Sequence, residues 1–165
     1  MTYTHTLAGI ALVAAMSAVS PLATAGEPAE TIKTVAGNFD EVFADLQDAV
    51  INRGLVIDYV GDVGKMLERT ADAASQSADA PPLLHARYLQ FCSAAITHEA
   101  IAADVQNLAM CPYVVFAYET RADPGKIAVG YRQVELAAAS PSQAAQAKVH
   151  ELLQAVVNET TGASQ

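Results

Sequence analysis

Apolar residues alternate, though not strictly, in the stretch 30–37, which has Ile32 and Val35, and this pattern predicts a β-strand. Residues 55–61 predict a second strand, with Leu55, Ile57 and Tyr59 on one side and Val56, Asp58 and Val60 on the other. Between these strands, apolar residues recur three or four positions apart, which predicts an amphipathic helix. Its apolar face consists of Phe39, Val42, Phe43, Leu46, Ala49 and Val50. Asn38 is placed to cap the first turn, with Glu41 completing a capping box, and Gly54 is placed to end the helix.

The rest of the chain continues the alternation of helices and strands. Asp62 is placed to cap a second helix, and residues 72–82 are small, polar and closed by two prolines, which predicts an exposed loop. Further strands are predicted over 86–93, 112–119 and 127–136, and further helices over 96–109 and about 141–158. The strand tyrosines are expected to pack in the core, and they are Tyr59, Tyr88, Tyr113, Tyr118 and Tyr131.

This order of elements predicts an α+β fold. We expect a mixed sheet of about five strands with helices mainly on one face, in the order β-α-β-α-β-α-β-β-α. Residues 26–165 are about 140 residues long, the size of one globular domain. We place the core of that domain at about 32–136. We expect the predicted C-terminal helix to pack across this core or against a partner.

The first 25 residues have the pattern of a signal peptide. An apolar run from 7 to about 19 carries no charged side chain, and it is followed by Ala23-Thr24-Ala25, the small-x-small pattern that signal peptidase recognises. The alternative is an uncleaved membrane anchor, although the run is shorter than the ~20 residues that a membrane span needs. The sequence therefore predicts a periplasmic or secreted protein, cleaved following Ala25.

Charge narrows the choice of partners. The formal net charge of −9 lies entirely outside the first 25 residues. Nucleic acids and anionic lipids are bound by clustered Lys and Arg side chains, which this chain lacks. We therefore expect no nucleic-acid partner, and no membrane association after signal cleavage.

The two cysteines, Cys92 and Cys111, allow three interpretations. An oxidising compartment and an even number of cysteines favour a disulfide. If the flanking strands were parallel neighbours, the two residues would lie at opposite ends of the sheet, too far apart to bridge, and would be separate thiols. An antiparallel arrangement would bring them together. The third interpretation is a metal-binding or redox site.

His98 is the third candidate site residue, because it lies six positions after Cys92 near the start of the helix predicted there. A cysteine and a histidine at this spacing, with Cys111 or Met110 as a further ligand, would suit a soft metal such as Cu(I) or Zn. The helix start would alternatively lower the pKa of the Cys92 thiol and make it reactive. The competing interpretation is a histidine on a solvated helix face.

Three stretches of this chain resemble a known family. They are "FDEVFADLQDAVINRG" running into "LVIDYVGDVGKML", then "YLQFCSAAITHEAIAAD", then "MCPYVVFAYE". They are similar to the family catalogued as domain of unknown function 302, in which one cysteine closes a strand and a second opens the next, as Cys92 and Cys111 do here. The resemblance covers about residues 32 to 136 and implies a small domain that often pairs as a homodimer. It implies no established activity.

Two classes of function remain open from the sequence. The chain contains no Gly-rich phosphate loop, no G-x-S-x-G and no H-E-x-x-H, so no required cofactor and no enzyme class is indicated. The first class is a noncatalytic binding or accessory protein. The alternative is a thiol-redox or soft-metal-binding protein that uses Cys92, His98 and Cys111. Redox catalysts usually carry a resolving cysteine nearby, often as C-x-x-C, and its absence favours the first class.

Overall fold

The computed structural model describes residues 31–71, 82–134 and 142–162. Its strands are β1 (Ile32–Ala36), β2 (Ile57–Asp62), β3 (Leu83–Phe91), β4 (Tyr113–Thr120) and β5 (Lys126–Tyr131). Its helices are α1 (Phe39–Ile51), α2 (Val63–Thr70), α3 (Ala94–Ala103), the 3-10 helix η1 (Val105–Met110) and α4 (Gln143–Thr161). The predicted α+β class and order of elements are confirmed. The predicted signal peptide and residues 72–81 of the predicted loop lie outside the described residues.

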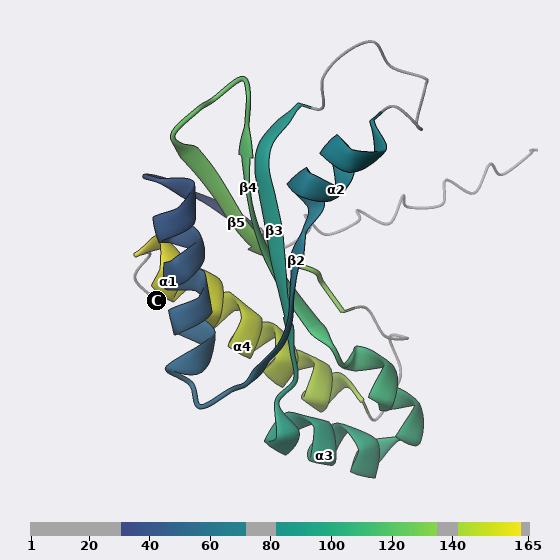
Figure 1. Ribbon diagram of the computed structural model, residues 1–165. Helices are drawn as coiled ribbons and strands as arrows, with labels where there is room; N and C mark the ends of the chain where they lie inside the picture. Colours follow the sequence, from purple (N-terminus) through teal and green to yellow (C-terminus); the bar gives the residue numbers. More distant parts are fainter. Residues whose placement is uncertain (1–30, 72–81, 135–141, 163–165) are drawn as a thin grey trace, which may run out of the picture.

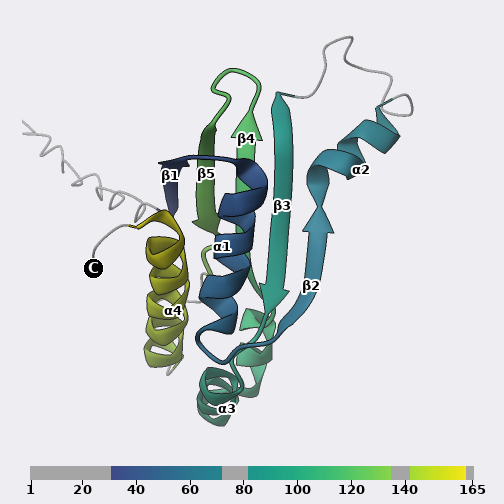
Figure 2. The same cartoon turned by 60° about the vertical axis from the view of Figure 1, so that its left-hand side comes forward.

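The five strands form one sheet in the order β1-β5-β4-β3-β2, and every neighbouring pair is antiparallel. The sheet is therefore antiparallel throughout, where the sequence suggested a mixed one. The strands that α1 connects do run in the same direction, but they lie at opposite edges with three strands between them. The connections through α2 and α3 join antiparallel neighbours instead, since both helices lie towards the ends of the sheet (Figures 1 and 2).

Two helices, α1 and α4, cover one face of the sheet, which confirms that helices lie mainly on one face (Figure 2). The six apolar residues predicted for the buried face of α1 are all buried. They pack against the side chains of the strands that point the same way, among them Leu89, Phe91, Tyr113, Val115 and Ile127. The alternate strand residues form the opposite face, which we call the open face.

Local sequence explains the ends of these elements. The Asn38 side chain accepts hydrogen bonds from the backbone N–H groups of Asp40 and Glu41, at 2.9 and 3.3 Å, which confirms the predicted cap of α1. Gly54, with a φ of 71°, ends the turn after that helix. The helix predicted over 96–109 is interrupted at Asp104, whose extended backbone and side-chain bond to the Gln106 N–H start η1. Among the described helices, none is long and apolar enough to cross a membrane.

Candidate functional site

Cys92 and Cys111 form a disulfide, with their Cα atoms 5.7 Å apart. Cys92 directly follows β3 and Cys111 comes shortly before β4. These strands are antiparallel neighbours with Phe91 opposite Tyr113, so the end of one strand meets the start of the next. Of the three interpretations that the sequence left open, the structure has the bridge. The bridge closes the loop that contains α3 and η1, and its two cysteines are 19 positions apart in the sequence.

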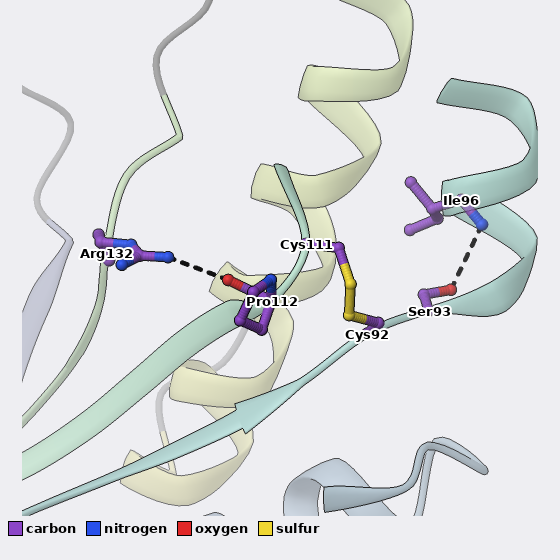
Figure 3. The surroundings of a disulfide bond; sticks show 6 residues. All are labelled: Cys92, Ser93, Ile96, Cys111, Pro112 and Arg132. Atoms are coloured by element: carbon purple, nitrogen blue, oxygen red, sulfur yellow. Dashed lines mark hydrogen bonds between the residues drawn. A yellow bond between two sulfur atoms is a disulfide. The ribbon is translucent and has the colours of Figure 1, made fainter. Parts of the chain in front are cut away.

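Backbone contacts fix both sides of the bridge (Figure 3). The Ser93 hydroxyl caps α3 by accepting from the Ile96 N–H at 3.4 Å. On the other side, the peptide bond between Cys111 and Pro112 is cis, and the Arg132 guanidinium donates to the Pro112 carbonyl oxygen at 3.0 Å. The disulfide therefore lies between the capped first turn of α3 and the start of β4. The start of β4 is held by Arg132, which directly follows β5. This environment is that of a structural cross-link.

His98 lies on an exposed part of α3. The next residue, Glu99, forms an ion pair with Lys148 of α4, so α3 is also tied to the helical layer by charge. In residues 31–71, 82–134 and 142–162, no group of three or more His, Cys, Asp and Glu side chains is close enough together to hold a metal ion. His98 and the bridged sulfur atoms are therefore not assembled into a ligand set in this structure.

A second cluster, which the sequence did not single out, is centred on Arg87 of β3. Its guanidinium carbon lies 5.3 Å from the centre of the Phe39 ring and 5.5 Å from that of Phe43. The same group pairs with Asp40 at 2.8 Å and with Asp62 at 3.5 Å. Arg87 therefore fastens the first turns of α1 to β3 and to the end of β2, and its charge is matched by two carboxylates.

His85 and Glu119 extend this cluster towards the turn between β4 and β5. The His85 ring stacks on Phe39 with centroids 5.0 Å apart, and its Nε2 atom lies 3.8 Å from the Glu119 carboxylate. Glu119 is buried and accepts a hydrogen bond from the Gly125 N–H at 2.7 Å. The Glu119 carboxylate thus contacts both Gly125 and His85. These contacts order one end of the sheet.

Asp62 joins the cluster to α2. Burial alone would raise the pKa of its carboxyl, but the hydrogen bond from the Lys65 N–H and the charges of Lys65 and Arg87 outweigh burial, so the pKa is lowered. The Lys65 N–H lies 2.8 Å from the Asp62 oxygen, which confirms the predicted cap of α2. A hollow of about 190 Å³ with mixed charge lies beside this cap, between α2 and β3.

The open face carries a different kind of hollow, with a volume of about 220 Å³. Its walls include Val63 at the start of α2, Leu83, Tyr88, Phe116 and Tyr118. The atoms that face it are almost all carbon. Together with exposed Tyr59, these aromatic side chains make the open face apolar over β2, β3 and β4, whereas the expectation had been that the strand tyrosines pack in the core. That expectation holds for Tyr113 and Tyr131 alone.

The family model described as "Domain of unknown function DUF302" matches residues 31–160. The chain belongs to the DUF302 family. Its structure is similar to the crystal structure of an uncharacterized conserved DUF302 protein from Bacillus stearothermophilus, with a TM-score of 0.63 and 13% sequence identity. The likeness covers 80% of this chain and 99% of that one. A search of curated proteins gave no match.

The DUF302 match and the similar structure establish the fold, and the described chemistry of this chain adds two places where function can reside. The Arg87 cluster and the open-face hollow lie on opposite sides of β3, because consecutive residues of a strand point to opposite faces. One signal in the sequence marks both. In "LLHARYLQF", His85 and Arg87 alternate with Ala86 and Tyr88, a polar row against an apolar row.

Proposed function

We propose that this DUF302 protein is an exported, noncatalytic binding or accessory protein that acts outside the cytoplasm as a homodimer. The observation that carries the proposal is the Cys92–Cys111 bridge, because it places both cysteines of the chain in a structural cross-link. A thiol-redox protein needs a cysteine that is attacked and a second that resolves it. Redox catalysts usually hold such a pair as C-x-x-C, whereas Cys92 and Cys111 are 19 positions apart.

Export is supported by two features that are independent of each other. The first 25 residues have the composition of a cleavable signal peptide, and disulfides persist in oxidising compartments such as the periplasm. Expression of the full chain in a Gram-negative host and an intact-mass measurement of the periplasmic fraction test this. We expect a chain that begins at Gly26 and is 2 Da lighter than its reduced form. A mass that retains residues 1–25 would contradict cleavage.

Pairing is supported by the open face. A chain with a net charge of −9 repels its own copies, so a second copy approaches most readily through a surface without charge. The β2 edge of the open face provides such a surface, because Val56, Tyr59 and Val60 are exposed along this edge and none of them lines the open-face hollow. Helices α1 and α4 lie on the other face of the sheet. Sedimentation at micromolar concentration is expected to give twice the mass of the mature chain, and a monomer at that concentration would remove the homodimer.

The experiment that separates the binding class from the redox class is a thiol titration of native and unfolded protein. We expect no reactive thiol in either state before reduction, and slow reduction of the folded protein by dithiothreitol. The alternative, a thiol-redox or soft-metal-binding protein using Cys92, His98 and Cys111, requires rapid reduction of the folded protein. It also requires that reduced protein take up Cu(I) or Zn stoichiometrically and lose that metal in His98→Ala.

A further inference from the structure

Four strands contribute one row of residues across the open face. Gly61 of β2 lies opposite Tyr88 of β3, Tyr88 lies opposite Phe116 of β4, and Phe116 lies opposite Gly130 of β5. The two aromatic residues are therefore neighbours in the middle of the row, and each has a glycine on its outer side. Directly opposed aromatic side chains ordinarily pack on each other across an antiparallel pair. Here the glycines offer each ring a second place to lie.

The Tyr88 ring lies over Gly61 and the Phe116 ring lies over Gly130, in the space that a larger side chain would fill. A Cβ atom at Gly61 would come 2.1 Å from the Tyr88 ring, and a Cβ atom at Gly130 would come 2.8 Å from the tip of the Phe116 ring. Tyr88 therefore leans towards β2, where its ring also meets Tyr59 with centroids 5.9 Å apart. Phe116 leans towards β5. The rings diverge, and the open-face hollow of about 220 Å³ has one of them in each wall.

The small side chain of Ala86 lines the hollow, as do Leu83 and Val63, the first residue of α2. The one charged residue that lines it, Arg87, sends its guanidinium to the other face of β3, where Asp40 and Asp62 neutralise it. The hollow is thus bounded by carbon and by matched charge in a protein of net charge −9. The net negative charge of the protein repels anions, and the described residues that line the hollow include no unpaired carboxylate that could bind a cation. The ligand that fits it is therefore uncharged.

We propose that this hollow is the ligand site of the protein and that it binds a small, uncharged aromatic molecule. The inference rests on the proposed binding function and gives that function its ligand class. An apolar cavity of about 150 Å³ in another protein accepts benzene. A hollow of about 220 Å³ has room for one aromatic ring with a substituent or for two fused rings. Such a ring lies between the faces of Tyr88 and Phe116 in the way that aromatic rings pack with each other.

The test uses toluene as the probe and benzoate as its charged counterpart. The mature, disulfide-bonded protein is titrated with each, and the amide signals of residues around the hollow are followed by NMR. We expect toluene to give saturable shifts at Gly61 and Ala86 with a Kd below its solubility of a few millimolar. Benzoate is expected to bind at least ten times more weakly. Absence of saturable toluene binding, or equal binding of benzoate, would overturn the proposal.

Two alanines of the open face provide a matched pair of variants. Ala86 and Ala128 are both buried, and both lie opposite Tyr118, one on β3 and the other on β5. Ala86 lines the hollow and Ala128 does not. Ala86→Leu fills the hollow and is expected to weaken toluene binding at least ten-fold, while Ala128→Leu changes it less than two-fold. Should Ala86→Leu fail to fold, Ala86→Val is expected to weaken binding at least three-fold.

Equal weakening in the two leucine variants would overturn the site, and so would an Ala86→Leu variant that loses the homodimer while it still binds toluene. These outcomes are separate from failure of the proposed function. Rapid thiol exchange or an uncleaved leader would refute the exported, noncatalytic role and leave the toluene result standing. Loss of toluene binding with a closed disulfide and a cleaved leader would refute the ligand class alone.

Discussion

Gly61 and Tyr88 lie directly opposite each other on β2 and β3, and the Tyr88 ring fills the space in which any larger residue at position 61 would place its Cβ atom. The pair is on the open face, opposite to the face that α1 and α4 cover, and Tyr88 is half-buried there. The glycine therefore provides the aromatic ring with a flat backbone to lie on. The ring therefore covers Gly61 of the edge strand β2 and lines one side of the hollow.

We expect Gly61→Ala to destabilise the protein by about 1–3 kcal/mol, because a Cβ atom 2.1 Å from the ring forces Tyr88 to move. Urea unfolding of Gly61→Ala, Tyr88→Leu and the double variant measures the coupling. The double variant is expected to lose less stability than the sum of the single variants. Gly37→Ala is the control, since its Cβ atom would meet Val42 at an ordinary 3.4 Å. Additive losses would show that the ring does not depend on Gly61.

Removal of the disulfide is expected to lower the free energy of unfolding by about 3 kcal/mol, the loss predicted for a closed loop of this length. The variant is Cys92→Ser combined with Cys111→Ser, and thermal and urea unfolding measure the change. Wild-type protein in dithiothreitol should behave like the variant, which itself should not respond to the reductant. His98→Ala should unfold like wild type, because His98 is exposed on α3. An unchanged midpoint in the double variant would contradict the structural role of the bridge.

The elements of this fold were predictable where the signal is local. The period of α1, its Asn38 cap and the Gly54 stop involve residues within one turn of each other, and all three are confirmed. The direction of the strands is not local, because it depends on whether a helix crosses a face or lies at the end of the sheet. The distance between Cys92 and Cys111 follows from that direction, which is why the sequence left the bridge open.

The burial of the tyrosines was not predictable for a related reason. Alternation along a strand divides residues between two faces, but it does not say which face the helices will cover. Tyr113 and Tyr131 face α1 and α4, whereas Tyr88 and Tyr118 point the other way. The same uncertainty hid Arg87, whose partners come from β2 and from α1. The alternation of polar and apolar residues in β3 marks a polar row that includes Arg87, but it does not say which distant residues will contact that row.

Arg87 is expected to stabilise the start of α1 mainly through its stacking on Phe39 and Phe43. Arg87→Met retains the apolar stem and removes the charge, and we expect a loss of about 1–2 kcal/mol in urea unfolding. The ion pair to Asp40 adds little, because that carboxylate is largely exposed. Arg87→Lys should recover less than half of the loss, since an ammonium group does not stack as a planar guanidinium does.

The control for Arg87 is Arg69→Met, an exposed arginine near the end of α2, which is expected to change stability by less than about 0.5 kcal/mol. Addition of 1 M salt screens exposed ion pairs strongly and buried stacking much less. We therefore expect most of the difference between wild type and Arg87→Met to persist in salt. A difference that disappears in salt, or full recovery in Arg87→Lys, would assign the stabilisation to the ion pairs instead.

Asp62 is expected to make stability depend on pH in the acid range. Its folded pKa is lowered, because the Lys65 N–H and the charges of Lys65 and Arg87 outweigh the opposing effect of burial. A carboxyl with a lowered folded pKa stabilises the fold above its unfolded pKa, near 3.8, and this stabilisation is lost as the pH falls through the folded value. Asp62→Asn retains a side chain that caps helices well and removes the charge.

Wild type should therefore be more stable than Asp62→Asn at pH 7, and the difference should shrink as the pH is lowered below about 4. Asp62→Ala separates the cap from the charge, because it removes both. We expect it to be less stable than Asp62→Asn by about 1 kcal/mol at pH 7, and to remain less stable at pH 2, where a protonated carboxyl or an amide still accepts from the Lys65 N–H. Urea unfolding of the three proteins at several pH values measures both effects. A constant difference between wild type and Asp62→Asn from pH 7 to pH 2 would show that the Asp62 charge contributes nothing to the fold.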